Sequence, residues 1–393
     1  MSAVPIAYPF VSVQVIPPPA PIAQRAPGVI AIVGTTPAGA AGGVAAVNTP
    51  IEIDTLDDAV TNFAALNGDG TVAATTLYTS IALAFLQNPR PSKIYGVRAA
   101  GTSYAAALAS LEGVTDVTFV GLANETTVGD STTSPPTGLQ ALKAHVEAMS
   151  SQGLNRIGVA MVDPTTAKTA TYVTDVVDAL TAPHTLVSDT SRMIMIAARG
   201  ADGDMATAAM AAIAGLAPQT SVVLKPVVGV DIPHEQRYSP SEITGLSNAN
   251  IIPIIHPALV TGDGLNFGEG RLFTSNAQLL FIDLVRVIDD VNFKLQAGLI
   301  GMIGDARITK PGLTLLKTQF QAVLEPIVDS AEIDDYDVDI PILDILQVPQ
   351  STWTAGQTAQ VTAARANRVL DVFVTIIYGP AVSRLQISLT VKF

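Results

Sequence analysis

The chain of 393 residues contains no cysteine, few charged residues and no apolar run long enough to cross a membrane. The absence of cysteine excludes a disulfide framework, a thiolate metal site and a cysteine nucleophile. Charged residues make up 14% of the chain and hydrophobic residues 48%. Such a low charge is typical of a subunit packed against copies of itself. The most apolar run, Met205 to Ala217, is interrupted by Thr207 and Gly215, so it predicts a buried helix.

The net charge of −13 and the sequence pI near 4.6 do not favour a nucleic-acid-binding protein, and no basic stripe offsets them. Residues Met1 to Ile16 have no basic segment and carry prolines where a signal peptide needs an apolar core. We therefore expect neither nucleic-acid binding nor secretion by the general pathway, and no stable membrane insertion.

Short apolar runs alternate with helical patterns between residues 25 and 255. This alternation predicts an α/β fold with a mostly parallel sheet covered by helices. We expect a first α/β unit to close near Ala100 and an exposed loop over 126–137. The expected strands are 28–34, 49–53, 94–98, 117–122, 156–162, 193–197 and 251–255, and the expected helices are 56–66, 76–86, 139–149, 167–180 and 205–216.

The remainder of the chain predicts three helices, at 276–297, 313–324 and 356–367, and strands at 335–339 and 369–378. In the first helix one apolar face is expected, while Arg286, Asp290 and Lys294 pair at four-residue spacing. That apolar face consists of Leu280, Leu284, Val287, Val291 and Leu295. Aspartates 335, 337 and 339 alternate with apolar residues, which indicates one solvated face of a strand rather than a calcium loop.

Both ends of the sequence show the alternation of a half-buried strand. Near the N-terminus a stiff proline run follows the alternating residues, so this strand cannot easily fold back as a hairpin. Its backbone groups still need partners, and the sheet edge of another subunit can supply them. The apolar residues of these two arms are Val11, Val13, Val15, Leu385, Ile387, Leu389, Val391 and Phe393. The expected hinges are Pro17, Pro18, Pro19, Gly379 and Pro380.

Motifs for catalysis or metal binding do not emerge from the sequence. The loop Gly34 to Gly39 follows a strand as a phosphate loop would, but it lacks the Lys-Ser/Thr pair, and Pro37 removes an amide donor. It is interpreted as a tight turn, as is Asn67 to Gly70. The four histidines, at 145, 184, 234 and 256, have no zinc-binding spacing, and no nucleophile elbow is present. We expect no enzyme activity, no metal and no cofactor.

Several segments, taken in order, resemble the contractile sheath family of contractile-tailed phages, R-type pyocins and related injection systems. The first is an apolar strand that ends in Val-Gly and is followed by a small-residue loop. Others are a helix followed by a strand ending in Val-Arg, and an arginine-threonine element before a long helix. The segments are 27–39, 55–63, 77–85, 94–98, 242–255, 270–274 and 369–378, with the terminal strand after them.

This resemblance implies a structural subunit of a helical sheath, with stacked hexameric rings, that contracts around an inner tail tube protein. It also implies baseplate and tail terminator partners, and a place in a virion tail or a contractile injection particle. Arg365 and Arg368, one turn apart, are expected to face the tube, although simple surface solubility explains them nearly as well.

The resemblance also sets the expected domain organisation: a discontinuous α/β core, an inserted α/β domain, and two extended terminal arms. The expected boundaries are 1–24 for the N-terminal arm and linker, 25–100 and 250–378 for the core, 101–249 for the insertion, and 379–393 for the C-terminal arm.

Two other interpretations remain open. A different structural protein, such as a tail terminator or a shell component, would share the low charge and the lack of catalytic motifs. An α/β enzyme with a site at the end of its sheet is the other alternative, because many chemistries use that architecture.

Overall fold

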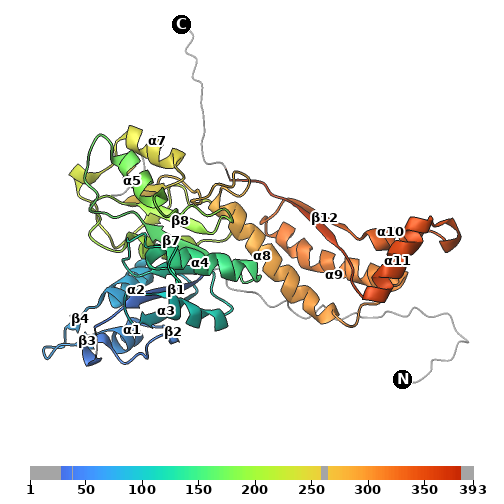
Figure 1. Ribbon diagram of the computed structural model, residues 1–393, viewed down its shortest axis with the longest axis horizontal. Helices are drawn as coiled ribbons and strands as arrows, with labels where there is room; N and C mark the ends of the chain where they lie inside the picture. Colours follow the sequence, from blue (N-terminus) through green and yellow to red (C-terminus); the bar gives the residue numbers. More distant parts are fainter. Residues whose placement is uncertain (1–27, 38, 258–263, 382–393) are drawn as a thin grey trace, which may run out of the picture.

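The computed structural model describes residues 28–37, 39–257 and 264–381. It has two parts: a sheet lobe (residues 28–281) and a helical lobe (residues 282–381) that projects from it (Figure 1). No helix in the described part of the chain combines the length and the apolarity that a membrane crossing requires.

The sheet lobe is built on one large sheet with the strand order β2-β5-β1-β6-β7-β8-β10-β11-β9. Its central strands run parallel, while β2, β11 and β9 pair antiparallel with their neighbours, which confirms the mostly parallel sheet predicted from the sequence. The strands are β1 Val29–Thr35, β2 Pro50–Glu52, β5 Lys93–Ala99, β6 Phe119–Leu122, β7 Ile157–Met161, β8 Met193–Ala197, β9 Pro226–Val227, β10 Ile252–Ile255 and β11 Leu265–Phe267.

The prediction that an α/β unit closes near Ala100 is wrong, because the sheet does not end with the strands of that unit. Strand β1 lies between β5 and β6, so the sheet continues from the first predicted unit directly into the next. Sequence order hides this continuity, because β1 and β6 are far apart along the chain.

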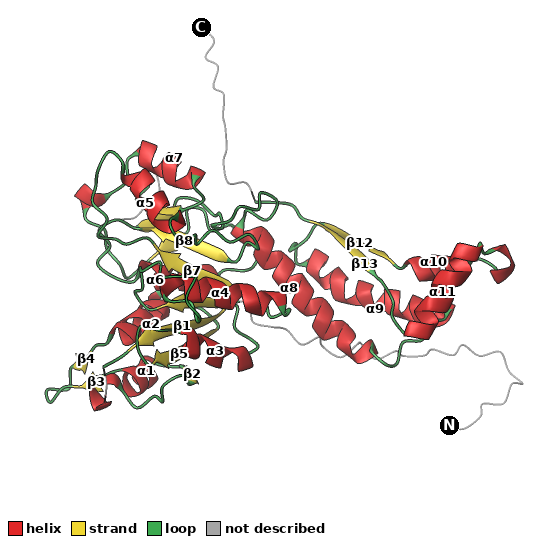
Figure 2. Cartoon of the chain, in the orientation of Figure 1, coloured by secondary structure: helices red, strands yellow, loops and turns green. Residues whose placement is uncertain are grey.

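Helices cover both faces of the sheet (Figure 2). Successive strand side chains point to opposite faces, so Ile30 and Ile32 enter one core while Ala31 and Val33 enter the other. The first face is covered by α1 Leu56–Phe63, α2 Thr76–Leu86 and α6 Met205–Gly215, and the second by α3 Ala105–Ser110, α4 Gly138–Ser151, α5 Tyr172–Thr181 and α7 Pro240–Asn248. Helix α6 is buried almost throughout, as predicted.

A short hairpin, β3 Ala65–Leu66 and β4 Val72–Ala73, encloses the predicted turn at Asn67 to Gly70. The amide of Gly70 donates to the Asn67 carbonyl at 2.9 Å, which closes that turn.

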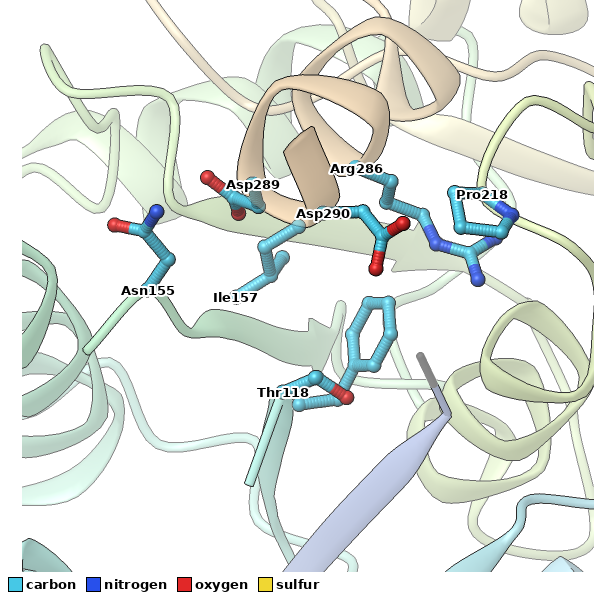
Figure 3. Close-up of a pocket in the computed structure, with 8 residues that line it drawn as sticks. Thr118, Asn155, Ile157, Pro218, Arg286, Asp289 and Asp290 are labelled. Atoms are coloured by element: carbon cyan, nitrogen blue, oxygen red, sulfur yellow. The ribbon is translucent and has the colours of Figure 1, made fainter. Parts of the chain in front are cut away.

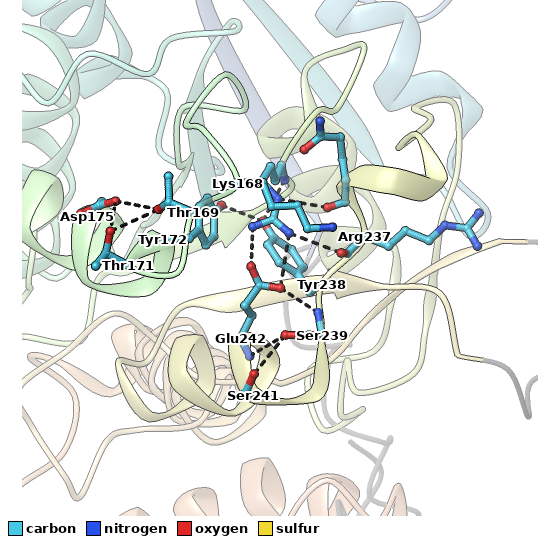
Figure 4. Close-up of polar contacts among 12 residues, drawn as sticks. Lys168, Thr169, Thr171, Tyr172, Asp175, Arg237, Tyr238, Ser239, Ser241 and Glu242 are labelled. Carbon is cyan, nitrogen blue, oxygen red and sulfur yellow. Dashed lines mark hydrogen bonds and ion pairs between the residues drawn. The ribbon is translucent and has the colours of Figure 1, made fainter.

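Arg199 is buried just after strand β8 and connects this strand end to α7. Figure 4 labels its partners Tyr172, Tyr238 and Glu242. The guanidinium of Arg199 lies 4.3 Å from the ring centroid of Tyr172 and 4.9 Å from that of Tyr238. It also forms an ion pair with Glu242 in the first turn of α7. Burial alone would raise the pKa of Glu242, but the bonds from Arg199 and Ser239 outweigh it and hold this pKa at about 2.

The helical lobe consists of two antiparallel helices, a two-stranded ribbon and a pair of short helices at its outer end (Figure 2). Their bounds are α8 Ile282–Leu299, α9 Lys310–Asp329, β12 Asp335–Asp339, α10 Pro341–Gln347, α11 Ala355–Asn367 and β13 Phe373–Ile377.

The predicted bounds of three elements in this lobe were wrong. Helix α8 begins at Ile282 rather than near 276, because the Asn276 side chain accepts bonds from the amides of Gln278 and Leu279 and holds a turn. Helix α9 continues past Leu324 to Asp329 with Pro326 inside it. Strand β13 is shorter than the predicted 369–378.

Candidate functional site

The ribbon formed by β12 and β13 is the part of the described structure best suited to bind another chain. The two strands pair antiparallel from Asp335 opposite Ile377 to Asp339 opposite Phe373. Within residues 28–37, 39–257 and 264–381, no further strand pairs with either of them. Each strand therefore presents an outer edge whose backbone groups can accept an added strand.

The two faces of the ribbon differ in character. The inner face packs Tyr336, Val338, Val374 and Ile376 against α8 and α9 in a third hydrophobic core. The outer face carries the three aspartates predicted to be solvated, and they are exposed. Beside them on β13, Phe373 is 59% exposed and Ile377 is 54% exposed. No group of three or more acidic or histidine residues in the described part is arranged to hold a metal ion.

Two tyrosines attach the ribbon to the helices beneath it. The Tyr378 hydroxyl donates to Asp283 Oδ2 at 2.7 Å, at the start of α8. The Tyr336 hydroxyl donates to Glu325 Oε2 at 2.9 Å, on α9. Burial and the bond to Glu325 raise the pKa of Tyr336 to about 12, so its hydroxyl remains protonated and can donate at neutral pH.

A compact charge cluster lies where α9 turns into the ribbon. Lys294 of α8 forms ion pairs with Asp290 and with Glu332. Glu332 is only 5% exposed, and burial together with the nearby Asp290 raises its pKa to about 7. The predicted pairing of Asp290 with Lys294 is thus confirmed.

Arg286 lies in a different environment from the paired helix face predicted for it. Its side chain is buried and donates to the carbonyl oxygens of Leu216 at 2.6 Å and Ala217 at 3.3 Å. Burial lowers the pKa of Arg286 to about 10, so it still carries its charge at neutral pH. The guanidinium lies 5.6 Å from the ring centroid of Phe119 in strand β6.

These contacts form a joint between the two lobes. Figure 3 shows the pocket at this joint, where Arg286 and Asp290 of α8 lie near Ile157 of β7. A cavity of about 30 Å³ lies there, bordered by β6, β7 and the first half of α8. Arg192 also crosses the joint and forms an ion pair with Asp289. The joint fixes the direction in which the helical lobe leaves the sheet, and so fixes the position of the ribbon.

The arm residues predicted from the sequence lie outside the described residues, as do Pro17, Pro18 and Pro19. Gly379 and Pro380 are described and follow Tyr378, the residue after β13. A Cβ atom at Gly379 would lie 2.5 Å from Asp334 Oδ2, so the ribbon end leaves little room for a side chain there. Their role as hinges stays a prediction.

The two arginines predicted to face a tube lie together at the end of α11. Both are exposed, and Arg365 Nε donates to the Ile308 carbonyl at 3.2 Å. Arg368 is the C-cap of the helix, with a φ of 55°. Their tube-facing role stays a prediction.

The most distinctive sequence candidates for chemistry make structural contacts instead. The Arg98 guanidinium donates to the Pro37 carbonyl at 2.7 Å, which holds the loop after β1. His145 is buried against Arg156 Nη1 at 2.9 Å, and burial, with the charge of Arg156, lowers the pKa of His145 to about 4.

Sequence reasoning missed the feature that defines the site. It predicted both ribbon strands but did not pair them, because β12 and β13 are separated by two helices. The alternation of three aspartates with apolar residues was the available signal. A strand with one solvent-exposed face needs a partner strand, and its other face needs a hydrophobic core to pack against.

Comparison with known proteins gave matches among solved structures alone: no family model and no curated protein sequence matches the chain. The sheath complex of an extracellular contractile injection system (PVC) in its contracted state is 14% identical, with a TM-score of 0.65, and the match covers 99% of this chain and 98% of that one. The baseplate of the anti-feeding prophage (AFP) in its contracted state also matches at 14% identity, with a TM-score of 0.67 and coverage of 98% and 99%. A sheath tail protein from Desulfitobacterium hafniense is 13% identical, with a TM-score of 0.54 and coverage of 85% and 94%.

The chain therefore has the fold of contractile sheath proteins, and at the level of the fold the resemblance predicted from the sequence is confirmed.

Proposed function

We propose that this chain is the structural subunit of a contractile sheath, which polymerises helically around an inner tube and contracts to drive that tube through a target envelope. The shared fold supports this proposal. The single observation that carries it is the β12–β13 ribbon, whose two strands lack a further strand partner in the described structure. The role is structural rather than catalytic, and its place is a phage tail or a contractile injection particle.

The terminal arms supply the strands that such a ribbon accepts. Residues 385–393 and 11–15 have the alternation of half-buried strands. In the proposed sheath, arms of neighbouring copies add to the two ribbon edges. About five net backbone hydrogen bonds in each arm, at about 1 kcal/mol each, would hold a subunit while its other contacts change.

This arrangement produces a tube without a closed ring of arm contacts. Each arm joins a different surface of the next copy, so the contact is head-to-tail, and repetition with a fixed rise and rotation gives an open helix. During contraction the rigid lobes move to a packing of lower energy while the arms stay paired, and Pro17 to Pro19 and Gly379-Pro380 absorb the change of direction. The energy that drives contraction is stored when the sheath assembles, so contraction requires no nucleotide.

The proposed partners are further copies of this chain in stacked hexameric rings, the tube inside them, and baseplate and terminator proteins at the two ends. Baseplate association is supported by the likeness to a chain from the anti-feeding prophage baseplate. Arg365 and Arg368 are the proposed contact to the tube.

Truncation after Arg384 tests the proposal directly, because it removes the whole alternating segment of the C-terminal arm. Deleting Leu385 to Phe393 should leave a folded monomer that forms no tubes, whereas the full chain should form striated hollow cylinders in negative-stain micrographs. Normal cylinders from the truncated chain would refute the arm mechanism.

A pair of matched variants tests whether tube formation requires the apolar face of the C-terminal arm or only the length of the arm. Replacing Ile387 and Leu389 with aspartate places two charges on the apolar face of the arm, and replacing Ser388 and Thr390 places the same charges on the polar face. The first variant should lose tube formation, and the second should retain most of it.

A further inference from the structure

A groove at the outer end of the helical lobe lies between α10, α11 and the start of β13. It encloses about 430 Å³. Its apolar lining includes Ile342, Val369 and Phe373, and the last two side chains are 60% and 59% exposed. Apolar side chains gathered in a hollow are suited to a partner segment that covers them.

The wall formed by α11 is narrow and uncharged. Gln360, Ala363, Ala364 and Asn367 line the groove, and their spacing places them on one stripe of the helix. The two alanines let a chain approach closely, while the two amide side chains can donate to its carbonyl oxygens. Asp371 is the one charged residue in this lining.

These features match an extended, uncharged, proline-rich segment. Polyproline II forms no internal hydrogen bonds, so its carbonyls remain free for side-chain donors, and its rings fill apolar grooves. The chain contains such a segment in Pro17 to Pro21, and residues 2–24 include no charged side chain. We infer that this groove holds residues 17–22 of the same chain.

The chain is long enough for this docking. A Cβ atom at Gly28 would lie 2.1 Å from the Ala214 carbonyl oxygen, and Arg286 of α8 bonds to nearby Leu216, so residue 28 lies beside the joint. From Arg286 to the end of α8 at Leu299 the helix rises about 20 Å. Between Pro19 and Gly28 the extended chain reaches about 30 Å.

The groove lies at that outer end. Arg365, on the same helix as the groove-lining alanines, bonds to Ile308 just before α9 begins. The α8–α9 turn and the groove are therefore neighbours, within reach of the proline run.

The other terminal segment fits the groove less well. Tyr378 bonds to Asp283 at the joint end of α8, and the described chain ends three residues later at Ala381. A return along β13 to Phe373 would use about eight residues, because the segment must span the same strand length again. That return would use residues 382–389, so the first half of the alternating segment 385–393 would lie along β13 and not in the groove.

The docked spacer would serve the proposed sheath, on which its purpose rests. It would hold residues 11–15 beyond the outer end of the helical lobe in a restricted direction. Restricting the free arm in this way lowers the ordering cost when a neighbouring copy captures it.

Because the chain has no cysteine of its own, any disulfide must form between cysteines introduced for the test. The full chain carrying Ala20→Cys and Ala364→Cys is oxidised mildly at low protein concentration, and products are resolved by non-reducing gel and intact mass. The matched control carries Ala20→Cys and Thr362→Cys, because Thr362 is exposed on the far side of α11. We expect an intramolecular disulfide in the first protein, formed about tenfold faster than in the control because docking raises the local concentration.

Circular dichroism of both proteins confirms that each is folded before oxidation. A disulfide-linked dimer would show that the groove binds a second copy of the chain. Equal rates in the two proteins, or no disulfide in either, would show that the proline-rich segment does not bind in the groove. Each of these results overturns the inference. Micrographs of the reduced protein test the sheath separately. Tubes without the intramolecular disulfide refute the docking alone, and the disulfide without tubes refutes the sheath proposal alone.

Discussion

The hydroxyl of Tyr378 donates to Asp283 Oδ2 at 2.7 Å and thereby fastens the residue after strand β13 to the first turn of helix α8. Asp283 is 8% exposed, so water cannot readily replace this donor. The bond joins the ribbon, which would accept strands from other copies, to the helix that is anchored in the sheet lobe. A force applied to the ribbon edge by a bound strand would therefore be transmitted through α8 to the joint between the lobes.

Replacing Tyr378 with phenylalanine should destabilise the chain by about 1–2 kcal/mol, because a buried carboxylate loses a donor while the packing of the ring is kept. Urea denaturation of the truncated monomer measures the change. Asp283→Asn combined with Tyr378→Phe closes a double-mutant cycle, and a coupling energy near zero would show that the bond contributes nothing.

Glu332 makes stability depend on pH. Its pKa in the folded chain is raised to about 7 from an ordinary value of 4.5, so the folded state binds more protons between these values. The stabilisation is present below pH 4.5 and is lost as the pH rises through the raised pKa of Glu332. Denaturation midpoints measured from about pH 5 to about pH 8 should show this decline.

Glu332→Gln removes the titrating group and should flatten the profile over the same pH range, with a gain in stability at the upper end. Glu112→Gln removes the same charge from an exposed position and serves as the matched control. A decline that persists unchanged in Glu332→Gln would assign the pH dependence to other groups.

Arg199 is the residue of the sheet lobe whose loss should cost most. Arg199→Met leaves the carboxylate of Glu242 without its ion-pair partner and removes a cation that lies over the rings of Tyr172 and Tyr238. We expect a loss of about 3–5 kcal/mol in unfolding free energy, whereas Arg199→Met with Glu242→Leu should recover part of it. Thermal melting of the three proteins checks this, and a loss below about 1 kcal/mol in the single variant would contradict it.

The architecture was predictable because the strongest signals are local. Apolar runs such as Val29 to Val33 are buried on both faces, which is typical of strands in a parallel sheet covered by helices. The long helices α8 and α9 repeat apolar residues at helical spacing, so their existence was clear even though their ends were not. The start of α8 depends on one side-chain bond at Asn276, which periodicity does not encode.

The ribbon and the joint were harder to predict because both depend on contacts between distant segments. Nothing in the local sequence of β12 indicates that β13 is its partner. Arg286 was predicted to pair with Asp290 along α8, because the two residues are four positions apart. The carbonyls that bind it, at Leu216 and Ala217, come from a different lobe. A charged residue on a helix can thus be either solvent-exposed or an anchor, and only the fold decides.

The outer end of α11 carries the proposed contact to a tube. Arg365 and Arg368 are exposed at the end of α11, and reversing both to glutamate should abolish co-assembly with tube protein while sheath-only cylinders still form.

The matched control reverses Arg90 and Lys168, two exposed basic residues of the sheet lobe, and so changes the net charge equally. Co-sedimentation of the cylinders with tube protein at low and high salt measures attachment. Attachment should weaken with salt for the wild-type chain and for the control, because exposed charges are screened. If the Arg365/Arg368 variant bound tube as the control does, the tube would have to contact the sheath through another surface.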